Sequence, residues 1–313
     1  MGLMNKIARS VTRGLLRKWA KIGKAPGLRY QWIQKIGPSL AESDSLMGHL
    51  PNGCVVECDI RDEVLRHIYF SGIYEDVESF IFFRLLQPGM TVLDVGANIG
   101  QYTMLASTAV GPTGHVHSFE PVEINYQRLS RNVQRNKLQN VQLNRVATWH
   151  EATTLRFQLP ADSMNNNGSF HVSSAMPENT LSYEAKAIRL DDYVREQAIN
   201  RVDVIKMDVE GAEAHTLRGA AATLERDSPI ILMEVNREAL EMLGSGTKSL
   251  MALLNSWGYR AWRIELDPAR CHDLDDLEVF GQGNVLLHRG DLPSTITEGW
   301  NLKMANRWGH TGF

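Results

Sequence analysis

The chain has 313 residues, of which 43% are hydrophobic, and it contains three cysteines. This length and composition are enough for one large core without a structural metal, and three cysteines at these spacings match neither a disulfide framework nor a paired zinc site. No run of eighteen apolar residues occurs, so the sequence predicts no helix that spans a bilayer. We therefore expect a cytoplasmic protein of enzyme size.

Residues 1–40 form a basic N-terminal segment. The first 41 residues carry nine Lys or Arg and no acid, whereas the remainder of the chain holds 24 bases and 36 acids. Apolar residues recur here at helical spacing: Met4, Ile7, Val11, Leu15, Trp19 and Ile22. This pattern predicts an amphipathic helix with a basic opposite face. Two interpretations remain: the helix packs on its own acidic body, or it contacts an anionic membrane, which would place the protein at the inner face of that membrane.

From about residue 74, short Val/Ile/Leu-rich runs alternate with amphipathic segments, as is typical of a parallel sheet. The expected strands span 91–95, 115–119, 141–147, 202–207 and 230–235, and an antiparallel pair, 259–264 with 284–287, closes the sheet. The expected helices span 76–86, 101–110, 122–137, 211–224 and 248–257. The prediction is a doubly wound, mostly parallel, seven-stranded Rossmann-like α/β sheet.

The same pattern divides the chain into parts. Lead-in strands and a helix occupy residues 41–90, the main domain occupies 91–290, and a C-terminal tail occupies 291–313. The regular alternation breaks between residues 148 and 201, which reads as a β-rich insertion around the polar stretch Asn165–Ser169. Loops of this length in compact domains are usually functional or disordered, so we expect this stretch to help shape a binding pocket.

Polar residues follow the predicted strands at the sheet edge where ligands of this fold class bind. After the first strand, Gly96 and Gly100 bound a turn that lets a cofactor approach the backbone at a helix N-terminus. After the second strand comes Glu120, placed so that it can accept hydrogen bonds from ribose hydroxyls, although a carboxylate is also favoured there by the helix dipole alone. Asp94 is the deepest charge in the first strand and needs a partner, such as turn amides or a cofactor ammonium. Together these residues predict a nucleoside site.

Several sequence blocks resemble the FkbM-type methyltransferases, which depend on S-adenosylmethionine and mostly modify hydroxyl groups of sugars and natural products. The blocks are Leu93–Thr103, Phe119–Pro121, Leu190–Asp192, Ile205–Glu213 and Leu217–Ala220. The resemblance implies that the methionine half of the cofactor is lined by Asp94, Gly96, Asn98, Gly100 and Thr103. It also implies that Glu120 binds the ribose and that Ala147 borders the adenine. The residues that follow, Thr148-Trp149-His150, depart from the family's usual pattern.

Methyl transfer to a hydroxyl requires an aligned oxygen and a group that accepts its proton. Asp208 ends the fourth strand and is the first candidate for this base, with His215 and His171 as second candidates because imidazole titrates in a suitable range. Glu213 and His215 also have an alternative role at the start of a helix, and Lys206 has one as the partner of an acid within the sheet.

Alternatives to this function stay open. Asp208, Glu234 and Asn236 are oxygen ligands that could hold a divalent metal, although we do not expect one. The favoured reaction is methylation of a hydroxyl on a carbohydrate, glycolipid or secondary metabolite, so the expected partner is a small-molecule, glycan or glycolipid acceptor and no nucleic acid. The competing hypotheses are an NAD-type oxidoreductase, disfavoured by the glycine spacing, and a non-catalytic peripheral membrane scaffold with a methyltransferase-like body.

Overall fold

The computed structural model describes residues 3–21, 26–41, 46–160, 171–172, 180–266, 269–274, 277, 281–293 and 296. The helices are α1 (Leu3–Lys21), α2 (Pro26–Ile36), the 3-10 helix η1 (Gly37–Leu40), α3 (Glu63–Ser71), α4 (Asp76–Leu85), α5 (Gln101–Val110), α6 (Glu123–Arg135), α7 (Leu190–Glu196), α8 (Glu213–Arg218), α9 (Ala221–Asp227), α10 (Arg237–Met242) and α11 (Thr247–Ser256). The strands are β1 (Leu46–His49), β2 (Val55–Cys58), β3 (Thr91–Val95), β4 (His115–Phe119), β5 (Val141–Asn144), β6 (Ala147–Thr148), β7 (Thr153–Pro160), β8 (His171–Val172), β9 (Thr180–Ile188), β10 (Val204–Met207), β11 (Ile230–Asn236), β12 (Arg260–Leu266), β13 (Ala269–Leu274) and β14 (Gln282–His288).

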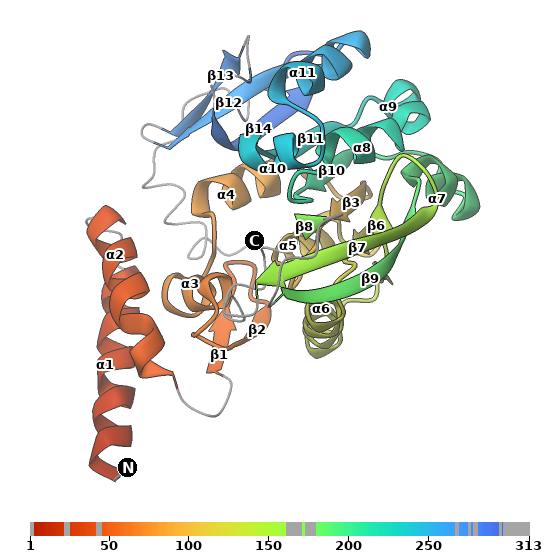
Figure 1. The fold of residues 1–313 in the computed structure, drawn as a ribbon. Helices are drawn as coiled ribbons and strands as arrows, with labels where there is room; N and C mark the ends of the chain where they lie inside the picture. Colours follow the sequence, from red (N-terminus) through yellow and green to blue (C-terminus); the bar gives the residue numbers. More distant parts are fainter. Residues whose placement is uncertain are drawn as a thin grey trace.

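The central sheet has the strand order β13-β12-β14-β11-β10-β3-β4-β5 (Figure 1). The strands from β11 to β5 pair in parallel, whereas β14, β12 and β13 pair antiparallel. This confirms the doubly wound, mostly parallel prediction, and β13 adds an edge strand to the seven that were expected. The chain runs outward from β3 to β5 and then returns through β10 on the other side of β3. The topological switch point, where such sheets bind ligands, therefore lies between β3 and β10.

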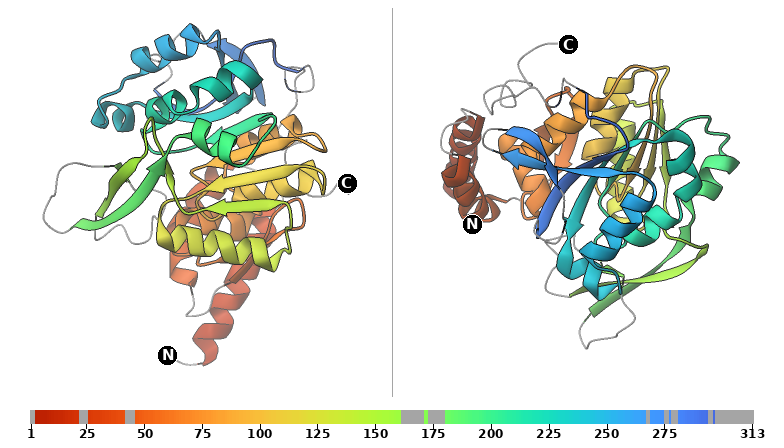
Figure 2. Two further views of the ribbon diagram at one scale, coloured as in Figure 1. Left: turned by 90° about the vertical axis from the view of Figure 1, so that its right-hand side faces the viewer. Right: turned by 90° about the horizontal axis from the view of Figure 1, so that it is seen from above.

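Helices cover both faces of this sheet (Figure 2). Successive residues of a strand point to opposite faces, so Val92 and Val204 pack with α4 and α5, while Leu93 and Ile205 pack with α7, α8, α9, α10 and α11. Both faces are closely packed cores, which explains why the strands read as continuous apolar runs in the sequence. The carboxyl ends of the strands are thereby held in fixed positions.

The insertion forms a second sheet with the order β6-β9-β7-β8. Here the predicted strand 141–147 is wrong: β5 ends at Asn144, and Ala147 begins β6, which pairs in parallel with β9 of the second sheet. The predicted helix 211–224 is also divided, into α8 and α9, at Gly219. A side chain at Gly219 would clash with the carbonyl oxygen of Trp149, so the junction of α8 and α9 packs closely on the chain that follows β6. The stretch Asn165–Ser169 lies outside the described residues.

The N-terminal helix α1 packs on α3 and η1 at one edge of the molecule (Figure 1). It does so through its basic side: Arg13 is only 6% exposed and donates to the carbonyl oxygen of Leu40 at 2.9 Å. Ile7, Val11 and Leu15 are 55%, 56% and 65% exposed, so these three residues of the apolar stripe face away from the body. The helix therefore does pack on its own body, as one of the two interpretations has it, but these three apolar residues take no part in that contact.

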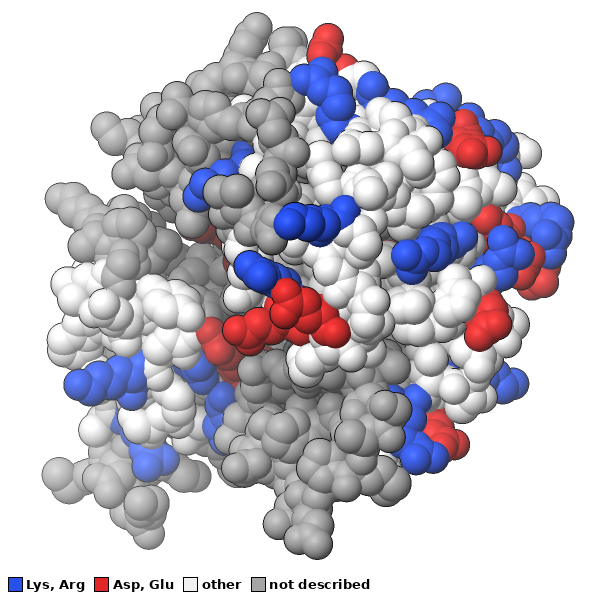
Figure 3. Space-filling view, turned by 45° about the horizontal axis from the view of Figure 1, so that its top comes forward, with Lys and Arg blue, Asp and Glu red and all other residues white. Residues whose placement is uncertain are grey.

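Charged side chains of both signs are mixed on the face drawn in Figure 3, with several acids gathered near its middle. Nucleic-acid backbones are usually bound by a continuous basic stripe. The charged residues visible there do not form such a stripe, and the expectation of no nucleic-acid partner stays a prediction. Among the described helices, none is long and apolar enough to cross a bilayer.

Candidate active site

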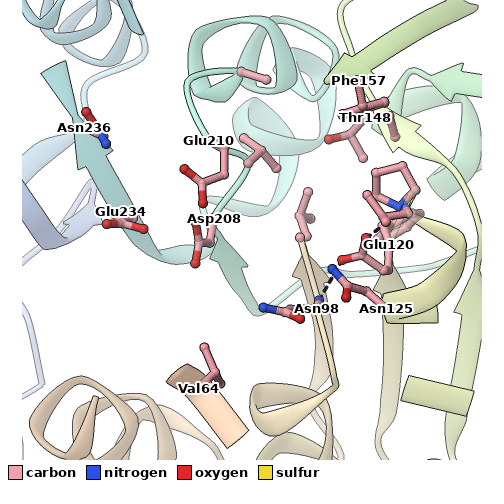
Figure 4. Close-up of a pocket in the computed structure, with 18 of the residues that line it drawn as sticks. Val64, Asn98, Glu120, Asn125, Thr148, Phe157, Asp208, Glu210, Glu234 and Asn236 are labelled. Atoms are coloured by element: carbon pink, nitrogen blue, oxygen red, sulfur yellow. Dashed lines mark hydrogen bonds between the residues drawn. The ribbon is translucent and has the colours of Figure 1, made fainter. Parts of the chain in front are cut away.

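A cavity of about 370 Å³ opens at the switch point, beyond the carboxyl ends of β3, β4, β10 and β11 (Figure 4). Its acidic lining residues are Glu63, Glu75, Glu120, Asp208, Glu210 and Glu234, and its other polar ones are Tyr74, Asn98, Asn125, Thr148, Asn236 and Gln282. The apolar lining residues include Val64, Phe119, Ala147, Leu155 and Phe157. Of the described residues that line the cavity, none is Lys, Arg or His. The cavity is therefore built to favour positively charged or hydrogen-bond-donating ligands.

The glycine turn forms the floor of the cavity. Gly96 has φ +82°, and a Cβ at this position would clash with the carbonyl oxygen of Asp208. The amides of Gly96 and Ala97 both donate to the carbonyl oxygen of Phe119, at 3.0 and 2.9 Å. These contacts join the ends of β3, β4 and β10, so glycine is required here both for its backbone angle and for its lack of a side chain.

Glu120 is 4% exposed and held by two backbone amides. One carboxylate oxygen accepts from Asn98 at 2.8 Å, and the other accepts from Val122 at 2.8 Å. Burial raises the pKa of Glu120 to about 7, and the two hydrogen bonds only partly oppose this shift. A carboxylate so fixed at the cavity wall still has lone pairs to offer, which suits the two hydroxyls of a ribose.

Three of the expected cofactor residues lie one layer behind the cavity. Asp94 is 1% exposed, and its carboxylate accepts a 2.5 Å hydrogen bond from Thr103, whose hydroxyl also contacts that of Ser118. Gly100 is the N-cap of α5 with φ +91°, and a Cβ there would meet Leu129. None of these three lines the cavity. Asp94, Gly100 and Thr103 therefore pack beneath the glycine turn and hold it in place. The cavity itself is lined by Gly96, Asn98, Glu120 and Ala147.

The second sheet supplies the wall at the expected adenine end. Ala147 and Thr148 of β6 line the cavity together with Phe157 of β7. The hydroxyl of Thr148 lies 2.9 Å from that of Thr216, which ties this wall to α8. A small residue and an aromatic ring at this place suit a flat base. Phe157 comes from the insertion, and its place here had no signal in the sequence.

Asp208 stands at the centre of the cavity, between Glu120 and a group of other acids (Figure 4). Its backbone amide donates to the carbonyl oxygen of Val95 at 2.9 Å, and its side chain is 34% exposed. The charge of Asp208, followed by burial, raises the pKa of neighbouring Glu234. Burial, followed by the charge of Asp208, raises the pKa of Glu210. The side of the cavity beyond Asp208 thus crowds like charges together.

The two histidine candidates are placed differently. The ring of His215 stacks on Trp149 with centroids 3.7 Å apart, and its Nδ1 lies 3.0 Å from that of His150. His215 does not line the cavity, so we do not carry it forward as a base. His171 begins β8, but its side chain lies outside the described part of the structure.

The metal alternative gains no support from the geometry. Asp208, Glu234 and Asn236 all line the cavity, but the side-chain oxygen of Asn236 already accepts from the amide of Ala239 as the N-cap of α10. Within the described ranges, no three His, Cys, Asp or Glu side chains converge to hold a metal ion. We therefore derive no role for a metal.

The sequence analysis did not find Glu75, which also lines the cavity. Glu75 is the N-cap of α4 and does not follow a strand, as the predicted site residues do. Its carboxylate accepts from the hydroxyl of Tyr102 at 2.8 Å and from the amide of Asn284 at 3.1 Å. Glu75, Asn98 and Glu210 all have positive φ, of 50°, 49° and 51°, and all three line the cavity. Such backbone strain in residues other than glycine is concentrated at functional sites, and the sequence carries no reliable signal for it.

A cavity at the switch point beside a glycine turn, in a mostly parallel sheet closed by antiparallel strands, is the arrangement expected of a Rossmann-like methyltransferase. The profile described as Methyltransferase FkbM domain matches residues 94–261. The chain therefore belongs to the FkbM methyltransferase family, whose members depend on S-adenosylmethionine.

The individual relatives have low sequence identity to this chain. The 31-O-demethyl-FK506 methyltransferase FkbM of Streptomyces tacrolimicus is 28% identical over 160 residues, which cover 43% of this chain and 60% of that protein. Methyltransferase 1 of Beauveria bassiana is 27% identical over 143 residues, covering 41% and 57%. The chain thus spans less than two thirds of these relatives. A solved structure, the FkbM methyltransferase of Methylobacillus flagellatus, is 15% identical with a TM-score of 0.41, covering 72% of this chain and 54% of that one.

Proposed function

We propose that this protein transfers a methyl group from S-adenosylmethionine to a hydroxyl of a small-molecule acceptor, in the class of carbohydrates, glycolipids or secondary metabolites. The observation that carries the proposal is the position of Asp208, which lines one cavity together with the glycine turn and Glu120. An oxidoreductase could share the glycine turn and Glu120, but the glycine spacing disfavours it and the matching family is one of methyltransferases. A non-catalytic scaffold would have no use for an acid-lined cavity at the switch point.

The residues present fit the cofactor. Gly96 lines the cavity with its backbone, Glu120 offers a fixed carboxylate for ribose hydroxyls, and Ala147 with Phe157 offers a flat apolar wall for the base. Bound S-adenosylmethionine supplies a methyl group on a positively charged sulfur. The electronegative cavity would favour that charge.

Asp208 would act on the acceptor. Its carboxylate would accept the proton of the acceptor hydroxyl as the oxygen forms its bond to the methyl carbon and the carbon–sulfur bond breaks. The acidic side of the cavity, with Glu75 and Glu234, would hold the other hydroxyls of the acceptor by hydrogen bonds. Alignment of the reacting oxygen is the larger part of such catalysis, because a methyl transfer is an in-line displacement.

The test is transfer of a labelled methyl group from S-adenosylmethionine into fractionated cell extract, followed by chemical location of the label. Label in an ether-linked methyl of a hydroxylated small molecule supports the proposal. Label only on nitrogen, carbon or carboxyl oxygen, or no transfer by a protein that binds S-adenosylhomocysteine, contradicts it. An Asp208→Asn variant run in parallel separates enzymatic transfer from background labelling.

We also propose that residues 1–40 contact an anionic membrane. The exposed stripe Ile7, Val11 and Leu15 lies on a segment that carries nine bases and no acid, which is the composition of helices that lie on anionic lipid. Co-sedimentation with vesicles of mixed neutral and anionic lipid at low salt tests this. Wild-type protein should pellet, and a variant with serine at all three positions should stay in the supernatant. Equal recovery of the two proteins would remove the proposal.

A further inference from the structure

Lys206 is a buried charge within the central sheet. It lies on β10, opposite Asp94 of β3 and Leu232 of β11, and is only 1% exposed. Its Nζ has no hydrogen-bond partner among the described atoms, and the ring centroid of Tyr102 lies 4.9 Å away. An ammonium without hydrogen bonds in such a place is costly, so nearby charge must offset its burial.

That charge comes from several elements at once. Asp208 follows β10, and its carboxylate oxygen lies 3.8 Å from Nζ. The other groups that face Lys206 are Glu75 and Glu78 from α4 and its N-cap, Tyr102 from α5, Asp94 from β3, Glu234 from β11 and Glu210 after β10. Burial by itself lowers the pKa of Lys206, but the carboxylates, Asp208 first, more than reverse this and raise it. The side chain is therefore an ammonium.

Among the described residues, Asp208 is the acid whose carboxylate lies within 4.0 Å of Nζ of Lys206. Asp94 already accepts from Thr103, and Glu75 accepts from Tyr102 and Asn284. The Asp208 carboxylate lies beside the ammonium of Lys206 and interacts with the carboxyl of Glu234. The attraction of the buried ammonium therefore acts directly on the Asp208 carboxylate oxygen that lies 3.8 Å from it.

We propose that Lys206 is a positioning residue for methyl transfer: its buried ammonium holds the Asp208 carboxylate in place at the wall of the cavity. This inference rests on the proposed function, in which Asp208 accepts the acceptor's proton. Lys206 itself does not line the cavity, so it acts through Asp208 and not by contact with the acceptor or the cofactor. The competing explanation is that Lys206 only balances the buried acids and supports the fold.

A double-mutant cycle separates the two explanations, because residues that act through one another are not additive. The full-length variants are Lys206→Met, Asp208→Asn and the combination, measured with labelled S-adenosylmethionine under saturating acceptor. We expect Lys206→Met to lower kcat about 100-fold, while the Kd of S-adenosylhomocysteine by calorimetry changes less than about twofold. In the Asp208→Asn background, the same substitution should change kcat less than about twofold. Lys206→Arg, which keeps the charge, should recover at least about a tenth of the wild-type kcat.

The controls keep the proposal open to contradiction. Glu78→Gln removes an acid that faces Lys206 but does not line the cavity, and it should leave kcat within about twofold of wild type. If Lys206→Met does not fold by circular dichroism, Lys206→Met with Glu78→Gln removes one unbalanced acid and replaces it in the cycle. An equal loss from Lys206→Met in both backgrounds overturns the inference. Full activity of Asp208→Asn instead contradicts the proposed function, so the two failures are distinguishable.

Discussion

The two sides of the cavity are built in different ways. On the side of Glu120, the polar groups are paired within the protein: backbone amides hold the carboxylate, and Asp94 is bonded to Thr103. On the side beyond Asp208, Glu210 and Glu234 crowd around one carboxylate, and their pKa values are raised in consequence. The first side is ordered before any ligand binds, whereas the second is electrostatically strained until a ligand or a proton relieves it.

This difference predicts that the Glu120 side determines the affinity for the cofactor and that the side beyond Asp208 determines the rate of methyl transfer. A preorganised side binds with little cost of reordering, so changes there should appear in the Kd of S-adenosylhomocysteine. A strained side holds charge that only the reaction or the acceptor uses, so changes there should appear in kcat and in stability. Four predictions test this division, each with its own measurement.

The largest effect is expected at the centre of the strained side. Asp208→Asn keeps the size of the side chain but removes the proton acceptor, so kcat should fall about 1000-fold. The Kd of S-adenosylhomocysteine should change less than about twofold. Glu238→Gln, an exposed acid in the first turn of α10, is the matched control and should have wild-type kcat. A large loss of cofactor affinity in Asp208→Asn would show that the two sides are not separable.

The second effect concerns the preorganised side. Gly96→Ala places a Cβ against the carbonyl oxygen of Asp208 and requires positive φ, so the turn must move and the Kd of S-adenosylhomocysteine should rise more than about 100-fold. Gly111→Ala is the matched control, since Gly111 has φ +66° with open space around it. Because Gly111 combines its positive φ with ψ −170°, a conformation that residues other than glycine rarely adopt, that variant should lose about 1–3 kcal/mol of unfolding free energy and keep wild-type affinity. If the two variants bound S-adenosylhomocysteine with equal Kd, the clash with the carbonyl oxygen of Asp208 would not explain the requirement for glycine.

The third effect is a pH dependence of cofactor binding. Burial raises the pKa of Glu120 to about 7, and ribose hydroxyls donate best to its ionised form. The ionised fraction rises from about a tenth at pH 6 to about nine tenths at pH 8, so the Kd of S-adenosylhomocysteine should fall about tenfold over this range. Glu120→Gln should bind more weakly at pH 8 and show a flatter profile by calorimetry. Tighter binding at pH 6 than at pH 8 in the wild type would contradict this assignment.

The smallest effect is a gain in stability on the strained side. The pKa of Glu234 is higher in the folded protein than in the unfolded chain, where it is near 4.5. The contribution of Glu234 to the free energy of unfolding is therefore fully present below pH 4.5 and is lost as the pH rises through the pKa of the folded protein. Glu234→Gln is neutral throughout, so at pH 8 its unfolding free energy should exceed that of the wild type by about 1 kcal/mol. Glu75→Gln should do the opposite, because replacing one carboxylate oxygen by an amide nitrogen removes an acceptor from the hydrogen bonds of Tyr102 and Asn284. Denaturant titration at pH 8 measures the unfolding free energy of both variants. A lower unfolding free energy for Glu234→Gln than for the wild type would contradict electrostatic strain on this side of the cavity.

The central elements could be predicted because their signals are local. The bounds 91–95, 101–110 and 115–119 agree with β3, α5 and β4, since apolar periodicity and the glycine turn fix them within a few residues of chain. The same holds for Gly96 and Glu120, which follow directly after strands. The division of strand 141–147 between two sheets was not readable, because Ala147 pairs with a strand forty residues further along the chain.

Sequence alone thus determined the sheet, the turn and the acids that end its strands, because each depends on neighbours within one element. Only the tertiary structure decided which acids share a cavity. In the structure, Asp94 and Thr103 do not line the cavity, whereas Glu75 does. Ile7 on α1 is exposed to solvent. These outcomes depend on how distant elements pack, and the free energies that govern such packing are not encoded in any single window of the chain.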